Sequence, residues 1–254
     1  MIDIHSHILF DTDDGAKNLD MTLDMLKNAV QDGTKKIVAT PHYCINYAEV
    51  PFGEIIKRVE NLRQIIKENH IDLELFCGQE VYMSKYIVEQ YEENKIGTIN
   101  DTKYMLVELP LREFESDTLD MIYELQLKGI KIILAHPERY IPVINNPCVI
   151  NDYVREGLLF QMNAGSICGQ FGKKVEKTAE TLLKNNIYSF IGSDAHDNIK
   201  RTTGLSKAIK IIDKKKYINT KLFFENAEDM LKDKEIQNPS IITPKKKYFF
   251  WRNK

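Results

Sequence analysis

Met1-Ile2-Asp3-Ile4-His5-Ser6-His7 opens the chain and combines the apolar pattern of a β-strand with two histidines two positions apart. Side chains two residues apart on a strand point to the same face, so His5 and His7 are expected to project together. Paired imidazoles of this kind suit a divalent metal ion. The opening stretch therefore predicts a metal site at the end of a first strand.

The same arrangement returns along the chain, because metal-capable side chains follow further apolar runs that have the pattern of strands. The predicted strands are Met1–Ile4, Lys36–Ala39, Leu73–Cys77, Tyr104–Leu109, Ile130–Ala135, Leu158–Asn163 and Ile187–Ile191. The side chains that follow them are His42, Glu80, Glu108, His136, Asp194 and His196. In parallel α/β barrels, active sites collect at the C-terminal ends of the strands. With His5 and His7, these residues are therefore expected to form one metal centre.

Amphipathic helical patterns alternate with the predicted strands. Leu19, Leu23, Leu26 and Val30 share one helical face, and a broader apolar stripe runs through residues 55–66. Seven β–α alternations predict a parallel (β/α)7 TIM-like barrel in a single domain, with a doubly wound open sheet as the alternative. We place this domain at residues 1–238 and a separate C-terminal tail at residues 239–254.

Composition is that of an ordinary soluble enzyme. The 254 residues are 43% hydrophobic and 28% charged, and the net charge of −2 gives no argument for nucleic acid as a partner. No apolar run approaches the roughly 20 residues that span a bilayer, and no secretory signal is recognisable at the N-terminus. Four cysteines without CxxC spacing give no sign of an oxidising compartment, so we expect the protein in the cytoplasm.

The predicted ligand set narrows the chemistry. Five imidazoles and three carboxylates without a thiolate are too many for one four-coordinate zinc ion and suit two or three bridged ions. Manganese, iron and zinc are all compatible with mixed nitrogen and oxygen ligation. Such clusters activate water and orient the oxygens of an in-line displacement, which favours hydrolysis of a phosphoester.

Taken together, HxH, TPHY, GxE, VE, HPER and SDAH resemble the PHP (polymerase and histidinol phosphatase) superfamily. More closely, MIDIHSHILFDTDDGAKN (residues 1–18) and IILAHPERY (residues 132–140) resemble the manganese-dependent protein-tyrosine phosphatases of Gram-positive capsule and exopolysaccharide operons. The resemblance covers about residues 1–231. It implies a distorted (β/α)7 barrel with a three-metal centre, manganese as the expected metal, and ligands at His5, His7, His42, Glu80, Glu108, His136, Asp194 and His196.

The resemblance also implies residues that act on the substrate. It places Arg139 and Arg201 near the substrate phosphate, whose oxygens match a planar guanidinium, although salt bridges at the barrel rim remain an alternative. It places Asp14 at the edge of the site, where a simple turn aspartate before Gly15 is the other interpretation. His42 or His196 can supply a proton if metal does not fully occupy it. Tyr43 and Tyr140 are candidates to flank an aromatic leaving group.

The expected reaction is attack on the phosphorus of phosphotyrosine by a hydroxide held between the metal ions, without a covalent phosphoenzyme. Cysteine-dependent tyrosine phosphatases need an arginine six positions after the nucleophile, and none of the four cysteines has one. Two alternatives stay open, a histidinol-phosphate phosphatase and a kinase-binding regulatory subunit without turnover. A third, a polymerase-type exonuclease, is disfavoured by the near-neutral net charge.

The resemblance further implies a substrate and a location. The expected partner is the phosphorylated tyrosine-rich tail of a membrane-associated bacterial tyrosine autokinase. Residues 241–254 hold five basic side chains, four aromatic ones and no acid. This tail is either loosely ordered or a contact with the inner face of an anionic membrane.

Overall fold

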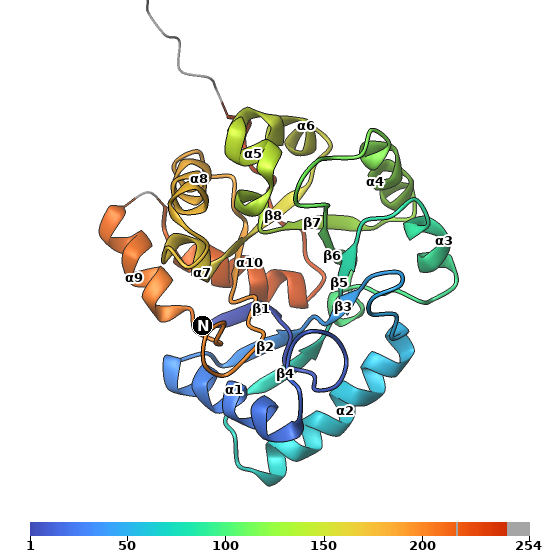
Figure 1. Cartoon of the computed structure of the whole chain (residues 1–254), viewed down its shortest axis with the longest axis vertical. Helices are drawn as coiled ribbons and strands as arrows, with labels where there is room; N and C mark the ends of the chain where they lie inside the picture. The colour runs from blue at the N-terminus through green and yellow to red at the C-terminus, as the bar shows by residue number, and fades with distance from the viewer. Residues whose placement is uncertain (217, 243–254) are drawn as a thin grey trace, which may run out of the picture.

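The computed structural model describes residues 1–216 and 218–242, in which parallel strands form a half-barrel ringed by helices (Figure 1). The strands are β1 (Ile2–Ser6), β2 (Lys36–Ala39), β3 (His42–Tyr43), β4 (Glu74–Cys77), β5 (Glu80–Tyr82), β6 (Tyr104–Glu108), β7 (Lys131–Ala135), β8 (Leu159–Asn163) and β9 (Phe190–Gly192). The α-helices are α1 (Leu19–Asp32), α2 (Phe52–Glu68), α3 (Ile87–Glu92), α4 (Thr118–Leu127), α5 (Ile141–Asn145), α6 (Ile150–Arg155), α7 (Ala164–Ile167), α8 (Lys173–Lys184), α9 (Ser206–Lys215) and α10 (Lys221–Leu231). Short 3-10 turns are η1 (Ile99–Asp101), η2 (Pro137–Arg139) and η3 (Pro147–Val149).

Two parallel sheets make up the half-barrel. One has the strand order β1-β2-β4 and the other β3-β5-β6-β7-β8-β9. The sheets meet where β1 runs beside the end of β9, since the Asp194 N–H donates to the His5 carbonyl and the His7 N–H to the Ala195 carbonyl, both at 2.8 Å. Because all the strand pairings are parallel, the carboxyl ends of the strands gather on one side of the molecule.

The predicted parallel α/β class is confirmed, and each of the seven predicted strands overlaps a strand of the structure. The sequential strand order excludes the doubly wound alternative, because such a sheet reverses its order at a switch point. Two short strands were missed: β3 follows β2 after Thr40-Pro41, and β5 follows β4 after Gly78-Gln79. The number of β–α units in a complete barrel stays a prediction.

Helix α1 illustrates how the local sequence sets the bounds of an element. The Asn18 side chain accepts a hydrogen bond from the Met21 N–H at 2.9 Å and so caps the first turn. Met25 and Leu26 lie on the buried face of the helix. Gly33 ends it with φ of 95°, a left-handed conformation that costs glycine little. The helix therefore ends at Gly33, just beyond the apolar face that Leu19, Leu23, Leu26 and Val30 predict.

The strands are buried on both faces, as expected for a parallel sheet covered by helices. Along β6, Tyr104 and Leu106 pack into one apolar cluster with Ala227 and Met230 of α10, whereas Met105 and Val107 pack into another. This alternation follows the two-residue period of a strand. Apolar side chains thus cover both faces of the strands, and the polar side chains of the site lie at the carboxyl ends of the strands.

The first residues of the predicted tail pack against the domain. Ile242 is 5% exposed, and its backbone N–H and carbonyl both hydrogen-bond to the Asn151 side chain, at 2.7 and 2.9 Å. Most of the basic and aromatic stretch lies in residues 243–254, outside the described residues. The boundary at residue 238 stays a prediction. No helix within residues 1–216 and 218–242 has both the length and the apolar character that crossing a membrane requires.

Candidate metal centre

All eight predicted metal ligands come together at the carboxyl ends of the strands. Seven of them are buried, with exposed fractions between 0% and 9%: His5, His7, Glu80, Glu108, His136, Asp194 and His196. His42 is the most open, with 15% of its side chain exposed. Charged and imidazole groups are rarely buried together unless they pair with one another or bind a metal. The structure therefore brings the eight predicted residues together in one largely buried cluster, and their role as metal ligands stays a prediction.

Backbone geometry aims these side chains at a common point. His5 and His7 lie at and just beyond the end of β1 and face the same side, as the strand period requires. His136 and Asp194, directly after or close behind β7 and β9, have φ values of 32° and 52°. A positive φ is uncommon for residues other than glycine and occurs preferentially at functional sites.

Glu80 lies at the centre of the cluster. Its Oε2 atom is 3.1 Å from Nε2 of His5, 3.2 Å from Nε2 of His7 and 3.2 Å from Nδ1 of His42. Its Oε1 atom is 3.0 Å from Nε2 of His136. Among the described residues, Oε2 has no partner in hydrogen-bond geometry. This buried, charged oxygen is therefore available to a cation.

Asp13 is a site residue that the sequence analysis missed. Its Oδ2 atom accepts hydrogen bonds from Nδ1 of His7 at 2.6 Å and from the His42 N–H at 2.8 Å. Because a carboxylate only accepts, Nδ1 of His7 carries a proton, and Nε2 faces the cluster, where it would offer its lone pair to a metal ion. A carboxylate behind a histidine in this way is typical of metal sites. The only sequence signal was its place beside Asp14 in the loop after His7.

The donor atoms fit a metal ion. Nε2 of His5 and Nε2 of His7 are 3.2 Å apart. Two nitrogens bound to one ion at about 2.0–2.1 Å lie roughly 2.8–3.4 Å apart at octahedral or tetrahedral angles. Three overlapping groups have ligand atoms within 4.8 Å of one another: His5, His7, Glu80 and Asp194; His42, Glu80 and Glu108; His7, Asp14, His42 and His196.

Electrostatics also favour positive charge in the cluster. Burial would lower the pKa of His7, yet Asp13 and Glu80 outweigh it and raise that pKa well above its ordinary value. Burial and the Arg139 guanidinium lower the pKa of His136 to about 4, so this imidazole is neutral at pH 7 and offers a lone pair. Burial and the Glu80 charge raise the pKa of Glu108 well above its usual range.

Asp194 connects the cluster to two arginines. Its Oδ1 atom faces the imidazoles, at 3.6 Å from Nε2 of His5 and 3.5 Å from Nε2 of His7. Its Oδ2 atom accepts a hydrogen bond from Arg139 at 2.9 Å and forms an ion pair with Arg201 at 2.7 Å. Burial would raise the pKa of Asp194, but His5 and Arg201 outweigh it and lower the pKa below its usual range. The two predicted arginines therefore lie next to the cluster.

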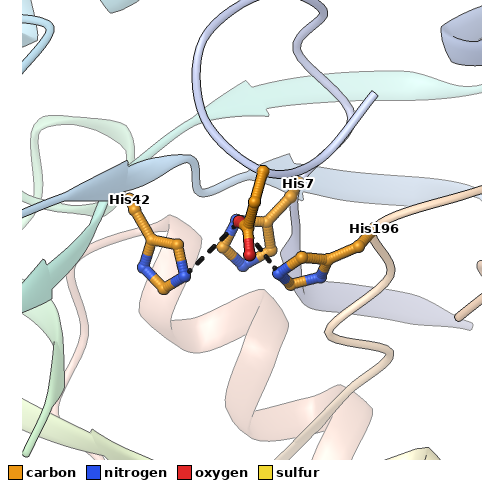
Figure 2. A group of neighbouring side chains, drawn as sticks. His7, His42 and His196 are labelled. Atoms are coloured by element: carbon orange, nitrogen blue, oxygen red, sulfur yellow. Dashed lines mark ion pairs between the residues drawn. The ribbon is translucent and has the colours of Figure 1, made fainter. Parts of the chain in front are cut away.

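Asp14 lies at the more exposed edge of the site, as predicted. Figure 2 shows the rings of His7, His42 and His196 grouped there. The Oδ1 atom of Asp14 is 3.3 Å from Nε2 of His196 and 3.8 Å from Nε2 of His42. With 41% of its side chain exposed, Asp14 is the most accessible carboxylate of the cluster. It contacts imidazoles directly, which goes beyond the role of a turn residue.

The two tyrosines proposed to flank a leaving group are buried and closed to a substrate, although the Tyr140 ring packs 5.8 Å from that of His136. Tyr140 is fully buried, and its hydroxyl donates to the Ala135 carbonyl at 2.8 Å and accepts from the Leu109 N–H at 3.0 Å. Tyr43 is also buried, at 3% exposed. That prediction was wrong, because position beside a ligand does not reveal which way a side chain points.

Two other aromatic residues lie at the site instead. Tyr47 is 63% exposed, with its ring centre 6.4 Å from that of His42. The Phe171 ring lies beneath both arginines, at 4.8 Å from the Arg139 guanidinium carbon and 5.9 Å from that of Arg201. Such cation–π contacts hold the planar guanidinium groups in place. No motif in the sequence distinguished either residue.

Comparison with known proteins identifies the family. The model of the family described as "Capsular polysaccharide synthesis, CpsB/CapC" matches residues 1–232. The chain belongs to this family. Members similar to it include the tyrosine-protein phosphatase YwqE of Bacillus subtilis, 31% identical over 99% of this chain and all of that protein. The tyrosine-protein phosphatase CpsB of Streptococcus agalactiae is 32% identical over 92% of this chain and 99% of that protein.

Solved structures of CpsB/CapC proteins share the fold. A chain from the crystal structures of YwqE from Bacillus subtilis and CpsB from Streptococcus pneumoniae, described as unique metal-dependent tyrosine phosphatases, matches with a TM-score of 0.90 at 30% identity. The match covers 96% of this chain and all of the other. The histidinol phosphate phosphatase of Lactococcus lactis matches with a TM-score of 0.55 at 14% identity, which shows a related fold only.

Proposed function

We propose that this CpsB/CapC protein is a metal-dependent protein-tyrosine phosphatase that hydrolyses phosphotyrosine in a protein substrate. The observation that carries the proposal is the buried cluster of imidazoles and carboxylates with two arginines directly beside it. Metal ligands and paired guanidinium groups together match the charge and geometry of a phosphate monoester. We infer a protein substrate by analogy with the tyrosine-protein phosphatases YwqE and CpsB.

We propose that the three overlapping groups of ligand atoms hold up to three ions, and that manganese is the physiological metal, with iron and zinc as alternatives. Glu80 belongs to two of these groups, so its carboxylate would help to hold more than one ion. When bound, such ions lower the pKa of water and neutralise charge on phosphoryl oxygens. The interrupted strands β2/β3 and β4/β5, each counted once, would complete the predicted (β/α)7 barrel around this centre.

The residues of the chain itself orient the phosphate. Arg139 and Arg201 donate to phosphoryl oxygens and stabilise the charge that builds on them during the displacement. Their existing contact with Asp194 keeps both guanidinium groups at the site before the substrate arrives. His42, whose pKa is lowered by burial, is neutral at pH 7, and together with Asp14 it faces the open edge where the phenolate departs. A phenolate is a good leaving group and needs little help from an acid.

We further propose that the phosphotyrosine lies in the tail of a bacterial tyrosine autokinase that controls capsule or exopolysaccharide synthesis, in line with the family description. The four cysteines, all within the described residues, are unpaired, which supports a reducing compartment such as the cytoplasm. Contact between the tail and the inner face of the membrane concerns residues outside the described ones and has no structural support.

Phosphate release from a phosphotyrosine peptide and from histidinol phosphate, measured side by side with manganese-loaded protein, tests the function. We expect kcat/KM to be at least about 10-fold higher for the peptide, since discrimination of this size needs only modest differences in pocket contacts. Preference for histidinol phosphate would overturn the protein-phosphatase assignment. Metal binding without turnover of either compound would favour the regulatory subunit.

Replacing Arg139 or Arg201 with methionine tests the phosphate-binding role. Loss of one charge-assisted contact, worth about 1.5–3 kcal/mol, is expected to lower kcat/KM for the peptide about 10- to 100-fold and to weaken inhibition by inorganic phosphate. Arg155→Met is the matched control, because that arginine pairs with Asp152 on the surface. Unchanged KM and unchanged phosphate inhibition in both site variants would contradict the role.

A further inference from the structure

Strand β8 supplies none of the predicted ligands, yet its last residues form a hydrogen-bonded chain behind the metal centre. Gln161 and Asn163 are both 0% exposed. Oε1 of Gln161 is 2.9 Å from Nδ1 of His5, and Nε2 of Gln161 donates to Oδ1 of Asn163 at 3.0 Å. Nδ2 of Asn163 donates to Oδ2 of Asp194 at 2.5 Å. Two buried amides thus connect one candidate ligand to another.

Asp194 determines the direction of the hydrogen bonds that connect Asn163, Gln161 and His5. A carboxylate only accepts, so Asn163 must present its NH2 group to Asp194 and its oxygen to Gln161. Gln161 must then donate through its NH2 group, which also reaches the Met162 carbonyl at 2.7 Å. If the Gln161 amide were reversed, its oxygen would face two acceptors. Its oxygen therefore faces His5.

The tautomer of His5 follows from this order. Because the Gln161 oxygen accepts, Nδ1 of His5 carries a proton, and in the neutral ring Nε2 carries the lone pair. That lone pair faces Oε2 of Glu80 at 3.1 Å and Nε2 of His7 at 3.2 Å, where only a cation satisfies all three atoms. The opposite tautomer would direct an N–H into the cluster and remove His5 as a ligand.

Gly192 of β9 leaves the space that this contact needs. A Cβ atom there would lie 2.6 Å from Cβ of His5 and 3.0 Å from Nε2 of Gln161. Gly192 pairs with Asn163 in the register of β8 and β9. The backbone N–H of Asn163 is separately bound to Glu138 at 3.0 Å, which fixes the strand end from which the side chain extends. Gly192 and Glu138 thus leave room for the two amide side chains and fix the strand end that carries them.

We infer that Gln161 and Asn163 are positioning residues of the metal centre. Gln161 sets the tautomer of His5, and Asn163 holds the Oδ2 edge of Asp194 so that Oδ1 faces the imidazoles. Both act through metal ligands and neither contacts the substrate. The inference rests on the proposed metal centre and extends it, because it assigns metal affinity to a strand that provides no ligand.

Manganese affinity of Gln161→Met, measured by competition with a chelating dye, is the test. Methionine keeps the length of the side chain and loses all three of its hydrogen bonds, so the Kd is expected to rise about 10- to 100-fold. In the metal-free protein, at a pH high enough to leave the His5 ring neutral, its ¹⁵N shifts should also change from those of a single tautomer to those of a mixture. Asn151→Leu is the control, because it removes two buried hydrogen bonds to Ile242 far from the ligands and should leave the Kd unchanged.

A merely structural role would lower the melting temperature in EDTA, as in the control, without altering the Kd. A Kd within twofold of wild type in a folded Gln161→Met protein would therefore overturn the inference. Should that variant fail to fold, Asn163→Ala is measured in the same way, and an unchanged Kd there would have the same meaning. Absence of metal binding by the wild-type protein would instead overturn the metal centre itself.

Discussion

Replacing Glu80 with glutamine is expected to lower kcat/KM for a phosphotyrosine peptide by at least about 10³-fold and to remove at least one equivalent of bound metal. Oε2 of Glu80 faces His5, His7 and His42 at 3.1–3.2 Å. An amide has no negative charge, and it places either N–H hydrogens or a weaker oxygen where the ions require a carboxylate. A loss of about 4 kcal/mol in transition-state stabilisation corresponds to a decrease of this size.

The control for this variant is Glu74→Gln on β4, a glutamate whose side chain is 66% exposed. It should retain full activity and the full metal content. Elemental analysis of both dialysed variants and their melting curves in EDTA would separate loss of metal from loss of fold. Full metal content together with activity within about 10-fold of wild type in Glu80→Gln would show that Glu80 does not help to hold the ions.

The sequence could predict which candidate ligands lie together, because their positions follow from a rule of topology. Parallel strands gather their carboxyl ends on one side, so side chains such as Glu108 and His136 meet although they are distant in the sequence. To apply this rule, one needs to know only where each strand ends, and the end of an apolar run in the sequence indicates that position. Even where an end was misjudged, as at Ile187–Ile191 against Phe190–Gly192, the ligand Asp194 stayed close behind it.

What the sequence did not reveal depends on side-chain direction and on partners outside the motifs. Asp13 and Asp14 are neighbours of the same type, and only the fold shows that Asp13 binds Nδ1 of His7. Tyr140 follows Arg139 directly but points into the core. Gln161 carries no charge and falls in a run that reads simply as a strand. Residues that hydrogen-bond to the candidate ligands from behind are therefore found only in the structure, because no spacing in the sequence identifies them.

The missed strands β3 and β5 have a related cause. Pro41 has no backbone N–H to donate, and Gly78 weakens a strand because it has no side chain to pack. Both residues interrupt an apolar run just before a ligand, so the following two- or three-residue strand has no recognisable pattern. The interruption has a structural use, because the pairing of His42 with Glu80 in the β3–β5 register brings two candidate ligands side by side.

Removing the metal ions is expected to abolish phosphate release altogether and to lower the melting temperature. With no cation bound, Nε2 of His5, Nε2 of His7 and Oε2 of Glu80 meet at 3.1–3.2 Å with only protons to separate them. A ligand that binds only the folded state stabilises it by about 2.7 kcal/mol at 100 times its Kd. For a chain of this size, that corresponds to a shift of roughly 5–10 °C.

Dialysis against EDTA, followed by calorimetry and a phosphatase assay, measures both effects, and adding back manganese, iron or zinc in turn shows which ion restores them. The melting temperature should rise with the concentration of the restoring metal, because binding draws the equilibrium toward the folded state. Phosphate release that persists after elemental analysis shows the metal to be gone would contradict the mechanism. Such activity would have to come from the arginines and imidazoles alone, without the metal-activated water on which the proposed mechanism depends.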